Sequence, residues 1–263
     1  MIASPDSDGL LSAVTEAARL AGRIAFRYYR RDLIVEIKSD GSPVTLADRE
    51  AESAVRDWLG SRFPDDAILG EEFGISEGRG RRWFIDPIDG TKSFVHGVPL
   101  WGSMVAVAEG EEVLAGAIYC PAVDELVAAA RGMGCYLNGR RCRVSSCATL
   151  ADATILATSE RFLRDPDRGP RWRDLGARVA VTRTWGDCYG YVLVATGRAE
   201  LMVDDRLSPW DTAALLPIIR EAGGVFTDWS GGMGLDGGDA IASNALLARD
   251  LRDALGVPVT NSV

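Results

Sequence analysis

The chain has 263 residues, 47% of them apolar and 25% charged, so it can bury a sizeable core, and the composition excludes collagen, coiled coils and disordered tails. The net charge of −9 argues against a nucleic-acid partner, because an acidic surface repels the phosphate backbone. The single histidine, His96, excludes sites that need two imidazoles, so any catalytic metal must be held mainly by oxygen atoms.

The N-terminal residues lack the basic and apolar stretches of a signal peptide, and no run of about 18 apolar residues could span a membrane. We therefore expect a cytoplasmic protein without a membrane partner. The five cysteines include no C-x-x-C pair, so we expect reduced thiols rather than a disulfide framework or a zinc ribbon.

The first part of the chain predicts two amphipathic helices. Ser7 or Asp8 can cap a helix from about 10 to 31, in which apolar side chains recur every three or four residues. A second helix is expected to begin at Thr45, because Asp48 three residues later can complete a capping box, and to end between 60 and 64.

From residue 83 the pattern changes to strands. Apolar runs at 83–87 and 103–119, the latter interrupted by a turn at 109–111, predict an antiparallel meander. After residue 144 the pattern is α/β, with short strand-like runs at 153–159, 200–205, 223–229 and 239–244 and helical stretches at 190–196 and 209–222. We predict a soft boundary near residue 148. Residues 1–148 would form a helix and antiparallel-sheet half, and 149–263 an α/β half.

The most informative acids stand where strands end. Asp86 follows an apolar run, and Pro87, which lacks an N–H and has a fixed φ, is expected to end the strand. In the tight turn that follows, Asp86 and Asp89 can face one point together with the Ile88 carbonyl. These are the hard oxygen ligands that Mg²⁺ prefers. Gly90 then permits close backbone approach, so its N–H and that of Thr91 can face a phosphate oxygen.

Each of these acids also has an ordinary interpretation. Asp86 and Asp89 could be turn residues, although buried carboxylates without a cation are costly. Asp211 could simply serve as the third residue of a helix that Ser208 caps. Glu72 is either a solvated neighbour of Glu71 or a support for the site.

Taken in order, Gly70-Glu71-Glu72, the run Asp86-Pro-Ile-Asp-Gly-Thr91 and Trp210-Asp211 resemble the inositol monophosphatase superfamily. The match runs from Lys38 to Asn244, nearly the whole chain. The resemblance implies an α+β protein with a layered αβαβα fold. It also implies a Mg²⁺-dependent hydrolase of small phosphate monoesters that forms a homodimer.

The resemblance assigns roles to individual residues. Two or three Mg²⁺ ions would be bound by Glu71, Asp86, the Ile88 carbonyl, Asp89 and Asp211. Gly90 and Thr91 would hold phosphate, while Glu71 and Thr91 orient a metal-activated water that attacks phosphorus in line. Asp48 would orient Thr91. Lys38 and Glu72 would support the site without contacting the metal.

Two further segments resemble the histidinol-phosphate phosphatases of histidine biosynthesis, namely Thr91-Lys-Ser-Phe94 and Trp185-Gly-Asp-Cys-Tyr-Gly-Tyr191. Asp187 replaces a small neutral residue of the inositol phosphatases, and its carboxylate could pair with the ammonium or imidazole of histidinol phosphate. Asp204, seven residues before Asp211, would be a second acidic substrate contact, and Arg183 could reach the substrate. Alternatively, Asp187 is a turn or capping acid before the helix at 190.

Other functions stay open at this point. The runner-up activity is inositol-1-monophosphatase, followed by a 3′-nucleotide phosphatase of the same superfamily. A non-catalytic metal or phosphate sensor is a further alternative, which the presence of both Glu71 and Thr91 argues against. His96 could act as a general acid, but we expect it to be a structural loop residue.

Overall fold

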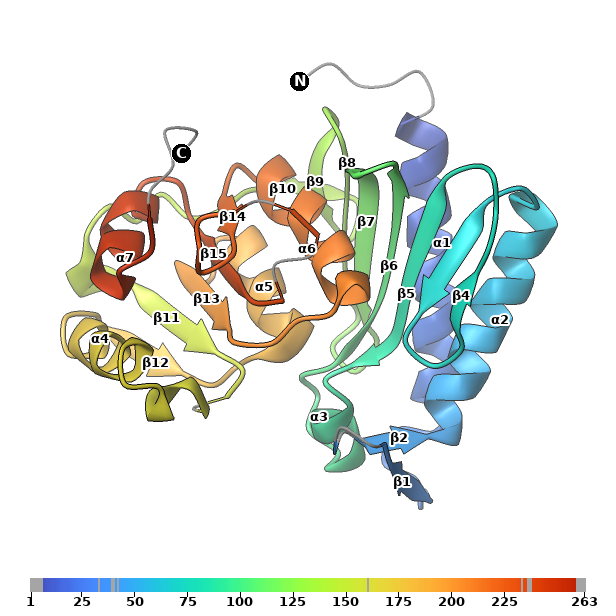
Figure 1. Cartoon of the computed structure of the whole chain (residues 1–263), viewed down its shortest axis with the longest axis horizontal. Helices are drawn as coiled ribbons and strands as arrows, with labels where there is room; N and C mark the ends of the chain where they lie inside the picture. Colours follow the sequence, from blue (N-terminus) through green and yellow to red (C-terminus); the bar gives the residue numbers. More distant parts are fainter. Residues whose placement is uncertain are drawn as a thin grey trace.

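The structure is a computed structural model that describes residues 7–32, 34–38, 41, 43–159, 161–232, 234–235 and 238–258. Its elements form successive layers of helix, sheet, helix, sheet and helix (Figure 1). This arrangement confirms the layered α+β fold expected from the sequence. No helix among the described residues is long and apolar enough to cross a membrane.

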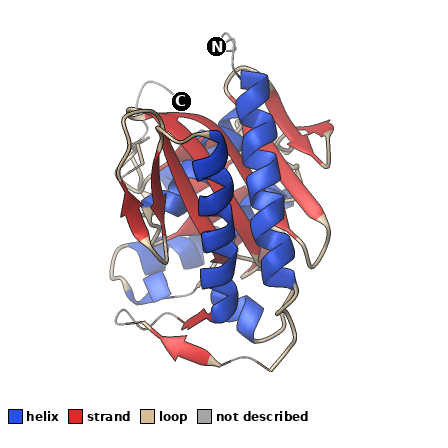
Figure 2. Cartoon of the chain, turned by 90° about the vertical axis from the view of Figure 1, so that its right-hand side faces the viewer, coloured by secondary structure: helices blue, strands red, loops and turns tan. Residues whose placement is uncertain are grey.

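The first layer consists of α1 (Ser7–Phe26) and α2 (Leu46–Arg62), which lie side by side on one face of a large sheet (Figure 2). The predicted start of α2 is confirmed, because Thr45 and Asp48 form a capping box. The predicted end of α1 near residue 31 is wrong. The chain leaves the helix after Phe26, and Arg30 has a φ of 58°, which a right-handed helix cannot contain.

The large sheet has eight strands in the order β10-β9-β8-β7-β6-β5-β3-β4. They are β3 (Ala67–Gly70), β4 (Gly74–Ser76), β5 (Arg82–Asp89), β6 (Gly102–Glu109), β7 (Glu112–Cys120), β8 (Glu125–Ala130), β9 (Gly134–Leu137) and β10 (Arg140–Cys142). The predicted meander is confirmed, since β6 and β7 are antiparallel and joined at Gly110, whose φ is 61°. A separate small sheet pairs β1 (Val35–Ile37) with β2 (Pro43–Thr45).

The second large sheet has five strands in the order β12-β11-β13-β15-β14. They are β11 (Thr154–Ala157), β12 (Val181–Arg183), β13 (Leu201–Asp204), β14 (Val225–Thr227) and β15 (Ala240–Ser243). All four predicted strand runs after residue 144 are confirmed, whereas β12 was not predicted. The outer face carries α4 (Arg168–Gly176) and α7 (Ala248–Leu255), while α5 (Asp187–Ala195) and α6 (Pro209–Glu221) lie between the sheets (Figure 1). Short helices are α3 (Thr91–Val95), η1 (Leu150–Asp152) and η2 (Arg161–Arg164).

Strand β5 corrects the expectation that Pro87 ends a strand. The strand continues to Asp89 through a bulge, because Asp86 pairs with Met104 but Asp89 pairs with Gly102. A bulge is one of the few places where a sheet accepts proline. Side chains three residues apart normally face opposite sides of a strand, and the extra residue lets Asp86 and Asp89 face the same side.

The two large sheets share one apolar core. Its largest cluster joins side chains of β6 to β9 with those of α5, α6 and β13. At Gly116 on β7, an added Cβ would lie 2.7 Å from the carbonyl oxygen of Ala214 on α6, so the helix packs directly against the strand backbone. The boundary near residue 148 stays a prediction, although the strands of the two large sheets fall on either side of it.

Candidate active site

Two carboxylates of β5 meet a third from the start of α6, which is far away in the sequence. Asp86, Asp89 and Asp211 each offer one oxygen, and these oxygens lie within 4.8 Å of one another. They line a cavity of about 150 Å³. The sequence-predicted residues that share this lining are Glu71, Ile88, Gly90 and Thr91. The structure therefore brings the predicted metal and phosphate residues to one cavity.

Burial and mutual repulsion make this cluster unfavourable without a cation. Burial raises the pKa of Asp86 and Asp89 well above the usual aspartate value, and neighbouring carboxylates raise it further. Burial likewise raises the pKa of Asp211 to about 7. A hard divalent cation would offset the repulsion, and carboxylate oxygens are the ligands that such a cation prefers. The acidic cluster can therefore hold a metal ion.

Backbone groups fix the orientation of each carboxylate. The Ile88 N–H donates to Asp86 Oδ1 over 2.9 Å. The Cys188 N–H, at the start of α5, donates to Asp89 Oδ2. The Ser208 N–H donates to Asp211 Oδ2 over 2.8 Å, so the predicted capping role of Asp211 is present together with its place in the cluster. One oxygen of each carboxylate is thus held by the backbone.

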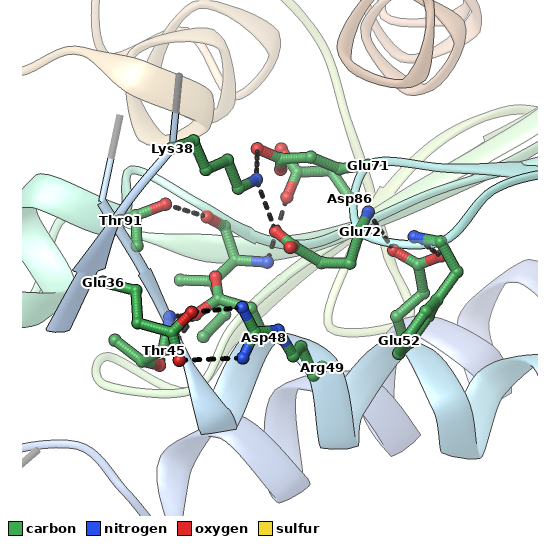
Figure 3. A network of polar contacts seen from close by, with 12 residues as sticks. Glu36, Lys38, Thr45, Asp48, Arg49, Glu52, Glu71, Glu72, Asp86 and Thr91 are labelled. Atoms are coloured by element: carbon green, nitrogen blue, oxygen red, sulfur yellow. Dashed lines mark hydrogen bonds and ion pairs between the residues drawn. The ribbon is translucent and has the colours of Figure 1, made fainter. Parts of the chain in front are cut away.

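Glu71 reaches the cavity from the turn after β3. Lys38 Nζ lies 2.8 Å from Glu71 Oε1 and 2.6 Å from Glu72 Oε1, between the two carboxylates (Figure 3). Burial lowers the pKa of Lys38, but its bonds to both glutamates outweigh this effect and raise it overall. Burial raises the pKa of Glu72 to about 7. Glu72 is therefore a partly buried partner of Lys38 and not a solvated neighbour.

Glu52 on α2 holds this turn, and sequence reasoning missed it. Its fully buried carboxylate accepts from the Glu72 N–H over 2.7 Å and from Arg56 Nε over 2.8 Å (Figure 3). A Cβ at Gly70 would lie 2.1 Å from Glu52 Oε1, so a side chain at this position would displace the Glu52 carboxylate. The available signal was an acid within the apolar face of α2, four residues before an arginine.

Thr91 and Asp48 form hydrogen bonds with different partners. The Thr91 hydroxyl donates to the Ile88 carbonyl over 3.0 Å. Asp48 Oδ2 instead accepts from the N–H and hydroxyl of Thr45, at 2.8 and 2.7 Å. Among the described residues no hydrogen bond joins Asp48 to Thr91. The orienting role of Asp48 therefore stays a prediction.

Asp187 lies beside the turn at Gly90. A Cβ at Gly90 would lie 3.1 Å from Asp187 Oδ2, and Ser93 Oγ donates to the same oxygen over 3.4 Å. Gly186 is the N-cap of α5, and no side chain caps that helix, so the alternative capping role of Asp187 is not what the structure shows. Burial raises the pKa of Asp187 to about 6.

Asp187, Asp204 and Arg183 are all absent from the lining of the cavity, although Asp187 lies beside Gly90, which lines it. Asp204 is only 6% exposed, and it accepts a hydrogen bond from the Tyr191 hydroxyl over 2.8 Å. Burial raises its pKa to about 8. Arg183 is exposed at β12 and donates to the Thr182 carbonyl. These two substrate contacts stay predictions without support from the geometry.

His96 does not line the cavity, whereas Arg206 does. His96 is exposed, its Nδ1 lies 2.8 Å from the Lys92 carbonyl, and it is absent from the cavity lining, in keeping with a structural loop residue. Arg206 lines the cavity from the segment between β13 and α6, although nothing in the sequence singled it out.

Comparisons with known proteins find relatives over nearly the whole chain. The model of the inositol monophosphatase family matches residues 6–256. A histidinol-phosphatase of Chlorobaculum parvum is 44% identical over 249 residues, covering 94% of this chain and 96% of the relative. An inositol-1-monophosphatase of Mesorhizobium japonicum is 36% identical, covering 95% of this chain and 97% of the relative. The crystal structure of the extragenic suppressor protein suhB from Bartonella henselae superimposes with a TM-score of 0.86 at 33% identity, over 97% of this chain and 100% of that one.

Proposed function

We propose that this chain, which belongs to the inositol monophosphatase family and is a phosphatase, hydrolyses L-histidinol phosphate to L-histidinol and phosphate in histidine biosynthesis. The proposal includes Mg²⁺ as the cofactor. The same proposal includes a homodimer, as the family resemblance implies, and a cytoplasmic location.

The observation that carries the substrate assignment is the Asp187 carboxylate beside Gly90. Histidinol phosphate has an ammonium group and an imidazole, either of which can pair with a carboxylate through a charge-assisted hydrogen bond. Inositol phosphate presents only hydroxyl groups around its phosphate. A partly buried carboxylate therefore favours the cationic alcohol, and a cationic partner would offset the burial that raises the pKa of Asp187.

The donor set fits Mg²⁺. Asp86, Asp89 and Asp211 supply oxygens that converge, and Glu71 and the Ile88 carbonyl line the same cavity. We propose that these groups hold two or three Mg²⁺ ions. When bound, Mg²⁺ would neutralise negative charge on the phosphate and lower the pKa of the water that it binds.

The chain's own residues would position the reactants. The first N–H groups of α3, next to Gly90, have no partner within their helix and can bind phosphate oxygens. Glu71 would accept a hydrogen bond from the attacking water, while Lys38 fixes its carboxylate. The Thr91 hydroxyl, held at the Ile88 carbonyl, would orient the same water.

The test compares kcat/KM for L-histidinol phosphate and inositol-1-phosphate in Mg²⁺, for the wild type and Asp187→Asn. Asparagine suits the left-handed φ of 50° at this position and keeps the size of the side chain while removing its charge. The loss of a buried ionic contact costs roughly 2–5 kcal/mol, so kcat/KM for histidinol phosphate should fall at least about tenfold more than that for inositol-1-phosphate.

The matched control is Asp174→Asn, which removes one exposed charge from α4. It should leave kcat/KM unchanged for both substrates. Equal losses on the two substrates would make Asp187 structural. A wild-type preference for inositol-1-phosphate would overturn the substrate assignment.

A further inference from the structure

Two cysteines face each other at the edge of the eight-stranded sheet. Strands β9 and β10 form a hairpin in which Cys142 is the direct register partner of Cys135. The hairpin turns through Asn138 and Gly139, whose φ angles of 48° and 76° suit a tight two-residue turn. The two sulfur atoms lie 3.5 Å apart and share a hydrogen bond. The turn and the register together hold the thiols in contact.

We propose that Cys135 and Cys142 form a reversible dithiol–disulfide modification site, which small-molecule disulfides such as oxidised glutathione can oxidise. Directly opposed residues of antiparallel strands have Cα atoms about 4.5–5.5 Å apart, within the roughly 4.4–6.8 Å that a disulfide spans. The sulfurs need to approach by only about 1.5 Å to reach the bond length of about 2.05 Å. Side-chain rotation can supply this approach without strand movement.

The reaction balances with one molecule of oxidised glutathione. The half-exposed Cys142 attacks as a thiolate, forms a mixed disulfide and releases one glutathione. Cys135 then loses its proton and attacks the Cys142 sulfur, which expels the second glutathione. Two protein thiols are oxidised by two electrons, and the two protons end on the two glutathione thiols. The hydrogen bond between the two thiols lowers the pKa of Cys142, which favours Cys142 as the attacking thiol.

The remaining cysteines are less suited to this reaction. Cys120 and Cys188 approach each other across Gly102, but they are 0% and 1% exposed, so an oxidant in solution cannot reach them in the folded protein. Cys147 lies after β10, and its sulfur contacts the Thr149 carbonyl, with no thiol partner among the described residues. The hairpin pair alone combines sulfur contact with access from solvent.

The position of the hairpin predicts the effect of the bond. Strand β10 lies five strands from β5 in the sheet order, or about 24 Å at the usual strand spacing. Beside Cys135, the Gly134 N–H donates to Glu221 at the end of α6 over 2.8 Å, so the hairpin is already fixed to the inter-sheet layer. Oxidation should therefore stabilise the protein against unfolding and leave phosphatase turnover unchanged.

The experiment incubates the purified, fully reduced chain in glutathione buffers of increasing oxidised fraction, quenches with acid, and alkylates all free thiols under denaturing conditions. Intact mass should show five alkylated thiols before oxidation and three after it, with peptide mapping locating the bond between residues 135 and 142. The melting temperature should rise on oxidation and return on reduction with dithiothreitol.

Two serine variants separate the site from the other thiols. Cys147→Ser should change from four alkylated thiols to two, as an intact pair requires, whereas Cys142→Ser should form no internal bond and show no rise in melting temperature. Five alkylated thiols in the wild type under the most oxidising buffer would overturn the proposal. A bond that survives Cys142→Ser, or that maps to Cys120 and Cys188, would also overturn it.

Discussion

At the scale of single residues, each carboxylate of the cluster performs two tasks. Asp211 accepts the Ser208 N–H at the start of α6 and also faces Asp86 and Asp89. Asp89 accepts the Cys188 N–H and thereby ties β5 to the start of α5. The backbone donors hold the carboxylates in place although burial and repulsion raise their pKa values. The positioning of the backbone and the proposed metal binding would therefore depend on the same side chains.

The variants Asp89→Asn and Asp211→Asn separate these two tasks, because the amide keeps an oxygen for the backbone donor but loses the charge. We expect each variant to lower phosphate release by at least about a hundredfold, since a metal ligand is removed. The metal-free melting temperature should hold or rise, because carboxylate repulsion is relieved. Circular dichroism melts and a Mg²⁺-dependent phosphate assay measure both, with Asp174→Asn as the control. If Asp211→Asn unfolds most of the protein while its folded fraction keeps full activity, Asp211 is only a cap.

At the scale of elements, local chemistry could be predicted and long-range partners could not. The capping box of α2 involves residues three apart, so the sequence alone identified it. The continuation of β5 through Pro87 depends on its pairing with Gly102 and Met104, which no local pattern encodes. Glu52 was missed for the same reason, because its partner Glu72 lies 20 residues away. Asp211 was assigned to the metal cluster through its family resemblance, since its local sequence also fits a helix cap.

The close contact between α6 and β7 predicts that a larger residue at Gly116 would displace helix α6. Gly116→Ala would place a methyl group 2.7 Å from the Ala214 carbonyl and 3.0 Å from its Cα, and both are backbone atoms. Helix α6 must then shift, which costs typically about 1–3 kcal/mol of stability. Because Asp211 begins this helix, the Mg²⁺ concentration for half-maximal activity should rise.

Urea unfolding and Mg²⁺ titration of phosphate release measure the two effects. Gly60→Ala is the matched control, because an added Cβ there meets nothing within 4 Å and glycine inside a helix is unfavourable by about 0.5–1 kcal/mol. This variant should be more stable than the wild type, and its Mg²⁺ concentration for half-maximal activity should be unchanged. A Gly116→Ala protein with wild-type stability would show that α6 does not pack rigidly on β7.

At the scale of the whole molecule, the acids around the cavity make the metal-free protein sensitive to pH. Burial raises the folded pKa of Asp48 to about 6, of Glu72 to about 7 and of Asp211 to about 7. The folded state therefore binds more protons than the unfolded state between about pH 4 and these values. Stability must then fall as the pH rises through this window.

We predict that, in a strong chelator, the melting temperature falls between pH 5 and pH 8. Saturating Mg²⁺ should reduce this fall, because the cation stabilises the ionised carboxylates of the folded state. Differential scanning calorimetry at fixed ionic strength measures both curves. A melting temperature that rises over this range in chelator would contradict the assignment of buried, repelling acids.

The proposed function requires metal-dependent hydrolysis of a phosphate monoester at the Asp86, Asp89 and Asp211 cluster. The most direct measurement is phosphate release from L-histidinol phosphate by the purified protein, first stripped of metal with a strong chelator and then supplied with Mg²⁺. We predict no release above background in the stripped protein and recovery of activity as Mg²⁺ is restored. Full activity in metal-free buffer would contradict metal-dependent hydrolysis at this cluster.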